Sequence, residues 1–276
     1  MRLLPEYPAE YLRRLGEAGD GPHDIAGAAL MFAALDHFGR DLSPHIAHLA
    51  EIAEQARLES QMAVNAEEGA RALAGLLAGR HGYDGDRLAY DDPQNADLIC
   101  VIDRRRGLPV TLGILYLHAA RAAGFDSAGL NSPGHFLLRI RCRGSEALID
   151  PFNGGAALER ERLGAPPSIR GASVEDDRAK QAVEDIEILL RLGNNQKLRA
   201  MQAGEMLRAL EIAKRMVLIA PRRPELWLDL AQLHEEEGTL GAARDAYDAC
   251  LALADAGAPL HNEAALRLQG LKRQLN

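Results

Sequence analysis

The stretch that decides the fold runs from Arg104 to Gly155 and reads RRRGLPVTLGILYLHAARAAGFDSAGLNSPGHFLLRIRCRGSEALIDPFNGG. Pro109 suits the first turn of a helix, where its missing N–H costs nothing. Apolar residues then recur at helical spacing, and Gly124 is the glycine expected just past the end of a helix. We therefore predict a helix from Pro109 to residue 123 that is buried over a wide face.

The second half of this stretch changes to a period of two. Residues 136–142, FLLRIRC, read as a strand, residues 143–145 as a turn, and residues 146–150 as the returning strand. A helix that packs on an antiparallel hairpin is typical of the α+β class. The sequence therefore predicts an α+β core.

The chain on either side of this core is helical in pattern. Before it, helices are predicted over 25–35, 43–53 and 66–78. After it, residues 164–180 are rich in Gly, Pro, Ser and charge, which is typical of a linker. We expect a first domain over 1–165, a linker over 166–183 and an all-helical domain over 184–276.

The helical tail shows the 34-residue tetratricopeptide (TPR) period. Its clearer unit has two predicted helices, and the residues that fit the repeat are Trp227, Leu230, Ala231 and His234, then Gly238, Ala243, Tyr247 and Cys250. Ala209 and Pro221 fit one period upstream, although the first helix of that unit matches poorly. A TPR-like tail is the favoured interpretation, and a generic helical hairpin is the alternative.

Composition narrows the classes of partner. The chain has 276 residues, 47% of them hydrophobic, and a formal net charge of −8, so we expect neither nucleic acid nor an anionic membrane as partner. The N-terminus lacks a secretory pattern and apolar runs are short, which predicts a cytoplasmic protein. Cys100, Cys142 and Cys250 form no CxxC pair, so no disulfide framework or zinc site is expected.

Two residues of the core are candidates for chemistry. His135 comes just before the first predicted strand and Asp150 ends the second, so the hairpin can bring them close together. A His oriented by a carboxylate is the base half of a nucleophilic triad. The alternative is structural, with the His packed on a loop and Asp150 capping a turn.

Several motifs of this stretch resemble the bacterial SirB-type family, in which a transglutaminase-like domain is joined to C-terminal TPR repeats. The most specific are Arg106-Gly107-Leu108-Pro109, Pro133-Gly134-His135-Phe136 and Asp150-Pro151-Phe152-Asn153-Gly154-Gly155. The resemblance implies a papain-like fold in which a central helix packs on an antiparallel sheet. It also implies a catalytic Cys at the start of that helix, with a His and an Asp on successive strands. His135 and Asp150 match the last two, but the Cys position falls at or near Pro109.

Another nucleophile would therefore be needed for catalysis. Thr111, in the first turn of the predicted helix, is a candidate if His135 takes its proton, and the alternative is that Thr111 caps or packs. None of the three cysteines is well placed by its spacing.

The arginine run offers a candidate anion site. Arg104, Arg105 and Arg106 can clamp a carboxylate or phosphate, or they can form salt bridges with nearby acids such as Asp103. The acidic residues between 91 and 97 lack the spacing of a calcium loop, and no cofactor motif is present, so we expect no metal and no cofactor.

These features leave two functional hypotheses. The first is a non-catalytic binding or regulatory protein that holds a protein or peptide partner in a transglutaminase-like pocket and on a TPR-like tail. The second is an acyl-transfer enzyme, a peptide or amide hydrolase or transamidase, that uses His135 and Asp150 with an unconventional nucleophile.

Overall fold

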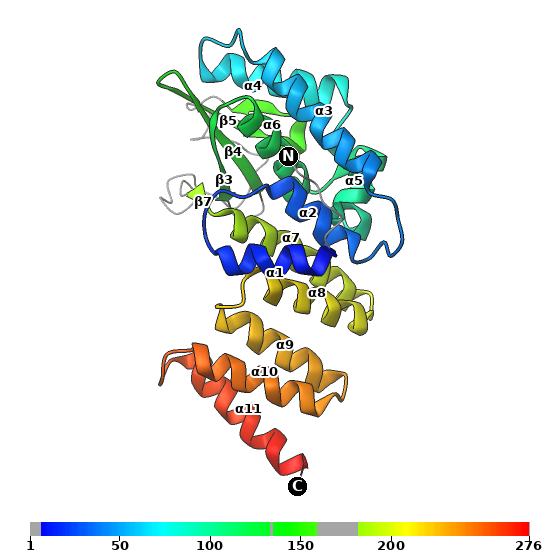
Figure 1. Ribbon diagram of the computed structural model, residues 1–276, viewed down its shortest axis with the longest axis vertical. Helices are drawn as coiled ribbons and strands as arrows, with labels where there is room; N and C mark the ends of the chain where they lie inside the picture. The colour runs from blue at the N-terminus through cyan, green and yellow to red at the C-terminus, as the bar shows by residue number, and fades with distance from the viewer. Residues whose placement is uncertain (1–6, 133–134, 159–181, 276) are drawn as a thin grey trace. The chain divides into compact units, whose positions relative to one another are not determined.

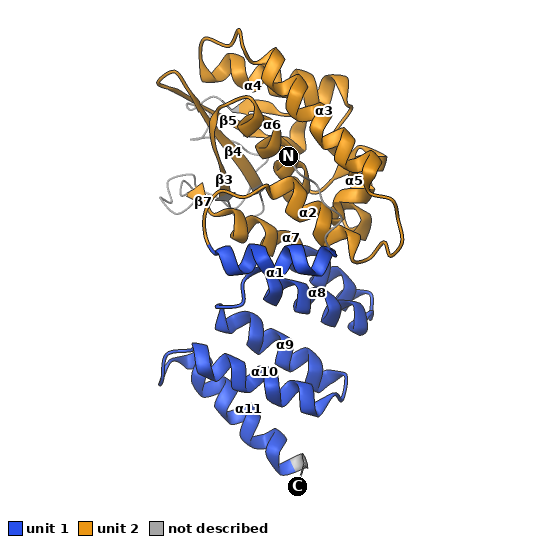
Figure 2. Ribbon diagram, viewed as in Figure 1, with its two compact units in different colours: residues 1–19, 193–276 blue, residues 20–192 orange. Residues whose placement is uncertain are grey.

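The computed structural model describes residues 7–132, 135–158 and 182–275. The chain forms two compact units (Figure 2), one made of residues 20–192 and the other of residues 1–19 together with 193–276. The predicted α+β class is confirmed, because one unit contains a sheet and the other consists of helices in its described part.

Several helices and helical turns precede the central helix in the unit formed by residues 20–192 (Figure 1). They are α2 (Ile25–Ala34), α3 (Ser43–Glu59), α4 (Ala66–Ala74), the π-helical turn η1 (Gly75–Arg80), the 3₁₀ turn η2 (Pro93–Ala96) and α5 (Leu98–Arg104). The strands β1 (Asp84–Gly85) and β2 (Arg106–Gly107) pair in parallel beside them.

The main sheet of this unit is antiparallel and has five strands in the order β6-β5-β4-β3-β7. They are β3 (Asp126–Ser132), β4 (His135–Cys142), β5 (Ser145–Asp150), β6 (Ala156–Leu158) and β7 (Ala182–Val183). The 3₁₀ turn η3 (Pro151–Asn153) joins β5 to β6. Arg143 and Gly144, both with positive φ, make the tight turn of the predicted hairpin.

Helix α6 (Pro109–Ala122) is the central helix that packs on β3 and β4. Its residues from Val110 to Leu117 are all buried, as the wide apolar face predicted. A Cβ atom at Gly113 would lie 2.2 Å from the Phe136 ring, and one at Gly129 of β3 would lie 2.6 Å from the same ring. Glycine at both positions is therefore what allows helix and strand to close on Phe136.

The other unit is helical. Helix α7 (Asp185–Gln202) enters it at Gly193, and α8 (Met206–Ile219), α9 (Pro224–Glu236), α10 (Leu240–Leu253) and α11 (Pro259–Leu275) follow. The predicted TPR-like unit corresponds to α9 and α10, which pack against each other and bury Ala231, Ala243 and Tyr247. The N-terminal helix α1 (Pro8–Ala18) packs on α8.

The compact units differ from the predicted domain ranges. Residues 166–181 of the predicted linker lie outside the described residues, and its last two residues form β7, which pairs with β3. The division between the units falls inside α7, and α1 belongs with the C-terminal helices. A search of the described residues finds no helix with the length and apolar character needed to span a bilayer.

Candidate functional site

The predicted general base and the carboxylate predicted to orient it lie on neighbouring strands. His135 begins β4, where its backbone pairs with Ser132, and Asp150 ends β5. Because β4 and β5 are antiparallel, both residues lie at the same end of the sheet. The side chain of His135 and residues 133–134 lie outside the described part of the chain, so the predicted pairing of His135 with Asp150 stays a prediction.

The carboxylate of Asp150 caps the turn that follows it. It accepts hydrogen bonds from the backbone N–H of Phe152 at 3.0 Å and of Asn153 at 3.3 Å, and from Asn153 Nδ2 at 2.6 Å. Burial raises the pKa of the nearby Tyr116 phenol, and the charge of Asp150 contributes to the same shift. Asp150 thus has the structural role of a cap in this arrangement, whatever else it does.

Thr111 is fully buried, and its hydroxyl donates a hydrogen bond of 2.9 Å to the carbonyl of Asn95. Successive helical residues are turned by about 100°, so Thr111 lies about 200° round α6 from Gly113, which contacts β4. Pro109, about 40° from Gly113 by the same geometry, is on the sheet-facing side. The role of Thr111 as a nucleophile stays a prediction. Two observations count against it, the hydrogen bond of its hydroxyl to Asn95 and its position on the side of α6 away from β4.

The three arginines of the predicted anion site have separate partners. Arg104 forms ion pairs with Asp86 at 3.4 Å and Asp92 at 3.1 Å. Arg106 donates to the carbonyls of Gly82 and Arg105. Their role in anion binding stays a prediction, and of the three only Arg105 lines the pocket described next.

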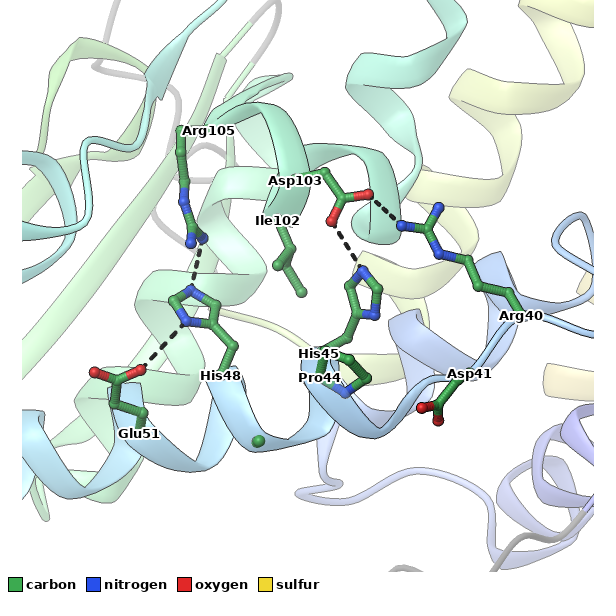
Figure 3. Close-up of a pocket in the computed structure, with 10 residues that line it drawn as sticks. Arg40, Asp41, Pro44, His45, His48, Glu51, Ile102, Asp103 and Arg105 are labelled. Atoms are coloured by element: carbon green, nitrogen blue, oxygen red, sulfur yellow. Dashed lines mark hydrogen bonds and ion pairs between the residues drawn. The ribbon is translucent and has the colours of Figure 1, made fainter.

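A surface pocket of about 740 Å³ lies between α3 and the end of α5 (Figure 3). Its polar lining comes from three segments, and the side chains are Arg40 and Asp41 before α3, His45, His48 and Glu51 on α3, and Asp103 and Arg105 at the end of α5. The pocket contains cationic donors, which are arginines, and anionic acceptors, which are carboxylates. Such a lining suits a polar ligand better than an apolar one.

One side of the pocket is a network around His48. Arg105 Nη1 donates to His48 Nε2 at 2.6 Å and also bonds the hydroxyl of buried Tyr83. Because a guanidinium only donates, Nε2 must accept, so the ring is neutral and its proton lies on Nδ1, 3.6 Å from Glu51. Burial, with the charge of Arg105, lowers the pKa of His48 to about 4, in agreement with a neutral ring.

The other side of the pocket holds a histidine–carboxylate pair. Asp103 accepts from His45 Nε2 at 3.0 Å and from Arg40 Nη2 at 2.6 Å. Burial opposes ionisation of Asp103, but these two bonds outweigh it and keep the pKa of that carboxyl below its usual value. Among the described residues His45 Nδ1 is buried with no hydrogen-bond partner, so this nitrogen is closed to solvent and Nε2, bonded to Asp103, is the polar atom of the ring that is engaged.

Sequence reasoning did not identify this pocket. Its signal was the pair of histidines three residues apart, His45 and His48, which share one face of a helix. Their partner Asp103 is 58 residues away from His45, a separation that no local pattern reveals.

Two of the three cysteines have a thiol pKa that is raised, not lowered. Burial, with the charge of Asp97, raises the pKa of Cys100 to about 11, and Cys250 is buried in α10 with its pKa also raised by burial. A nucleophilic cysteine needs its pKa lowered, because the thiolate is the attacking species. Cys142 lies at the far end of β4 from His135.

Comparison with known families matches both parts of the chain. Residues 44–194 match the model of the transglutaminase-like superfamily, which is more than half of the chain. Residues 196–269 match the model of the tetratricopeptide repeat. The predicted resemblance to a family that joins these two modules is confirmed.

Individual relatives are similar over part of their length. The chain is 32% identical over 170 residues to a UPF0162 protein of Xylella fastidiosa, covering 59% of this chain and 60% of that protein, so less than two thirds of that relative is matched. It is 30% identical over 203 residues to a UPF0162 protein of Pseudomonas aeruginosa, covering 72% and 73%. Over 72 residues it is 39% identical to F-box only protein 21 of Homo sapiens, covering 26% and 11%.

Proposed function

The chain belongs to the transglutaminase-like superfamily and to the UPF0162 family, and on this premise we propose that it binds a protein or peptide partner without catalysing acyl transfer. The observation that carries the proposal is the first turn of α6. There Pro109 occupies the sheet-facing position, and the nearby Thr111 hydroxyl is buried and bonded to Asn95. A proline side chain has no nucleophilic group, and a hydroxyl whose proton is donated to a backbone carbonyl is not activated by a base.

The C-terminal helices support the same proposal. TPR repeats generally mediate protein–protein interaction, because stacked helical hairpins present extended surfaces to a partner. In this chain the repeat region also exposes large apolar side chains, including Leu198 at 46% and Leu207 at 68%. A partner that covers these side chains removes apolar surface from water, which favours association.

The pocket between α3 and α5 supports a role in holding part of the partner. Its carboxylates at Asp41 and Glu51 suit hydrogen-bond donors such as a peptide amide or an amine. The guanidinium groups of Arg40 and Arg105 are already bonded within the chain.

A trapping assay tests the non-catalytic part of the proposal. We expect no hydroxamate product when the chain meets a panel of acyl-donor peptides with hydroxylamine as acceptor, and no difference between the parent and His135→Ala. Pro109→Cys is the matched gain-of-function variant, because it restores a thiol at the sheet-facing start of α6. Turnover by the parent that His135→Ala and Thr111→Val abolish would establish the alternative, an acyl-transfer enzyme.

A binding assay tests the role of the repeat region. Once a partner is isolated with the full chain, Leu198→Glu and Leu207→Glu should weaken its binding by about 10-fold or more, since burial of a leucine side chain contributes about 1.5–3 kcal/mol. Leu58→Glu, at an equally exposed position of α3, is the matched control. Equal affinity for all these variants would contradict binding through the repeats.

A further inference from the structure

Three side chains outside the transglutaminase-like centre converge at the start of α5. His37, from the segment after α2, places Nε2 2.9 Å from Asp97 Oδ2 and 4.0 Å from Cys100 Sγ. All three ligand atoms lie within 4.8 Å of one another. A search of the described residues for three or more His, Cys, Asp or Glu side chains close enough to share a metal ion finds this group.

The spacing of these atoms suits a tetrahedral ion. Zinc binds imidazole nitrogen at about 2.0 Å, carboxylate oxygen at about 2.1 Å and thiolate at about 2.3 Å. Ligand atoms on such an ion are therefore about 3.5 Å apart, and the two measured separations fall on either side of this value. Small side-chain adjustments bring all three atoms, which lie within 4.8 Å of one another, onto one ion.

The carboxylate of Asp97 is already oriented for this task. Asp97 caps α5, with Oδ1 accepting from the backbone N–H of Cys100 at 3.0 Å. This bond leaves Oδ2 directed at His37. A carboxylate held by a second hydrogen bond on its other oxygen is the usual arrangement of a metal ligand.

We propose that His37, Asp97 and Cys100 bind a divalent transition-metal ion of the zinc class. An imidazole, a carboxylate and a thiolate are the ligand types that zinc uses in proteins. In the bound state His37 Nε2 is the ligand atom and the imidazole proton is on Nδ1, and the thiol proton of Cys100 is released, with no change of oxidation state. The two anionic ligands then balance the charge of the ion.

The ion would have an open coordination position. His37 is 22% exposed at its side chain and Cys100 is half-buried, whereas Asp97 is 6% exposed, so solvent reaches the group from one side. Three protein ligands with an open fourth position hold a water molecule or a ligand atom from a partner.

Titration of the full chain with Zn²⁺ and with Co²⁺ tests the proposal. We expect one equivalent bound per chain, a thiolate-to-cobalt charge-transfer absorption, and release of one proton in calorimetry carried out in two buffers of different ionisation enthalpy. Zn²⁺ should also protect Cys100 from alkylation, which is read by mass spectrometry in the unsubstituted protein.

Two ligand variants and two controls complete the test. Cys100→Ser and His37→Gln should each weaken Zn²⁺ binding by more than about 100-fold, since even loss of an outer hydrogen bond costs 10–100-fold. Cys142→Ser should leave binding unchanged, as should His81→Gln, which removes one ring of the neighbouring His48–His81 pair. No saturable binding at micromolar Zn²⁺, no protection of Cys100, or unchanged affinity in both ligand variants would overturn the proposal.

Discussion

Arg105 has a backbone φ of 60°, in the left-handed region that residues other than glycine seldom adopt. This conformation costs about 1–2 kcal/mol. Its guanidinium offsets the cost by bonding His48 and Tyr83 and by lying 4.7 Å from the centre of the Tyr83 ring. The side chain that ends α5 thus also fixes one wall of the pocket, which explains why an arginine stands where a helix usually ends in glycine.

At the same scale, His48 should make stability depend on pH. Burial, followed by the charges of Arg105 and His81, lowers the pKa of His48 to about 4, while Glu51 opposes the shift. The unfolded chain takes up this proton near pH 6.5. The stabilisation is therefore present above about pH 6.5 and is lost as the pH falls towards 4.

His48→Gln tests this prediction, because glutamine keeps an acceptor for Arg105 but does not titrate. Between about pH 6.5 and pH 4.5 the parent should lose about 1–2 kcal/mol more folding free energy than the variant, allowing for the solvent that reaches the ring. Urea unfolding followed by far-UV circular dichroism gives both values. Parallel pH profiles would show that another group is responsible.

At the scale of elements, the packing of α6 on β4 depends on a missing side chain. A Cβ at Gly113 would lie 2.2 Å from the Phe136 ring. Gly113→Ala should therefore destabilise the chain by about 1–3 kcal/mol through overpacking, although alanine is the better helix former by about 1 kcal/mol.

Gly75→Ala is the matched control in the same unit. Gly75 has helical backbone angles, and a Cβ there would meet nothing within 4 Å. This variant should be neutral or more stable by about 0.5–1 kcal/mol. Denaturant midpoints of the two variants, compared with the parent, decide the matter; equal midpoints would mean that α6 and β4 are not closely packed at this point.

The central helix and the β4–β5 hairpin were predictable because their signals are local. Pro109, Gly124 and the turn at Arg143-Gly144 mark their ends, and a change of period separates them. Strand β3 was missed, since Asp126–Ser132 contains Gly129 and little alternation. Its pairing with β7, through Gly129 and Val183, depends on residues more than fifty positions apart.

The candidate site was less predictable than the fold. The triad-like residues follow from motif resemblance, but the hydrogen bonds of Thr111 to Asn95 and of Asp150 to η3 depend on the local path of the backbone. The Asp103–His45 and Asp97–His37 pairs join segments that are far apart in sequence. Spacing rules cannot detect pairs that tertiary packing creates.

At the scale of the whole molecule, one compact unit is built from both ends of the sequence, residues 1–19 and 193–276. The N-terminal helix α1 belongs to the unit that contains the repeats, where it packs on α8 and buries Leu12 and Leu15. A Cβ at Gly16 would lie 2.1 Å from the carbonyl oxygen of Leu218, so the two backbones approach closely. The end of a short repeat array exposes an apolar face that another element must cover. Helix α1 covers α8 with its own apolar face.

Removal of residues 1–19 should therefore destabilise the repeat-containing unit. Leu12 and Leu15 each contribute up to about 1.5–3 kcal/mol on burial, and Leu12→Ala alone should cost about 2–5 kcal/mol. Trp227, the single tryptophan of the chain, lies in α9, so its fluorescence reports the unfolding of this unit separately from far-UV circular dichroism. Both changes should lower the urea midpoint seen by Trp227, whereas Arg14→Ala, on the exposed side of α1, should shift it by no more than about 0.5 kcal/mol. A Trp227 midpoint that is insensitive to Leu12→Ala would show that the repeats are stable without α1, and that the N-terminal helix is an appendage of this unit.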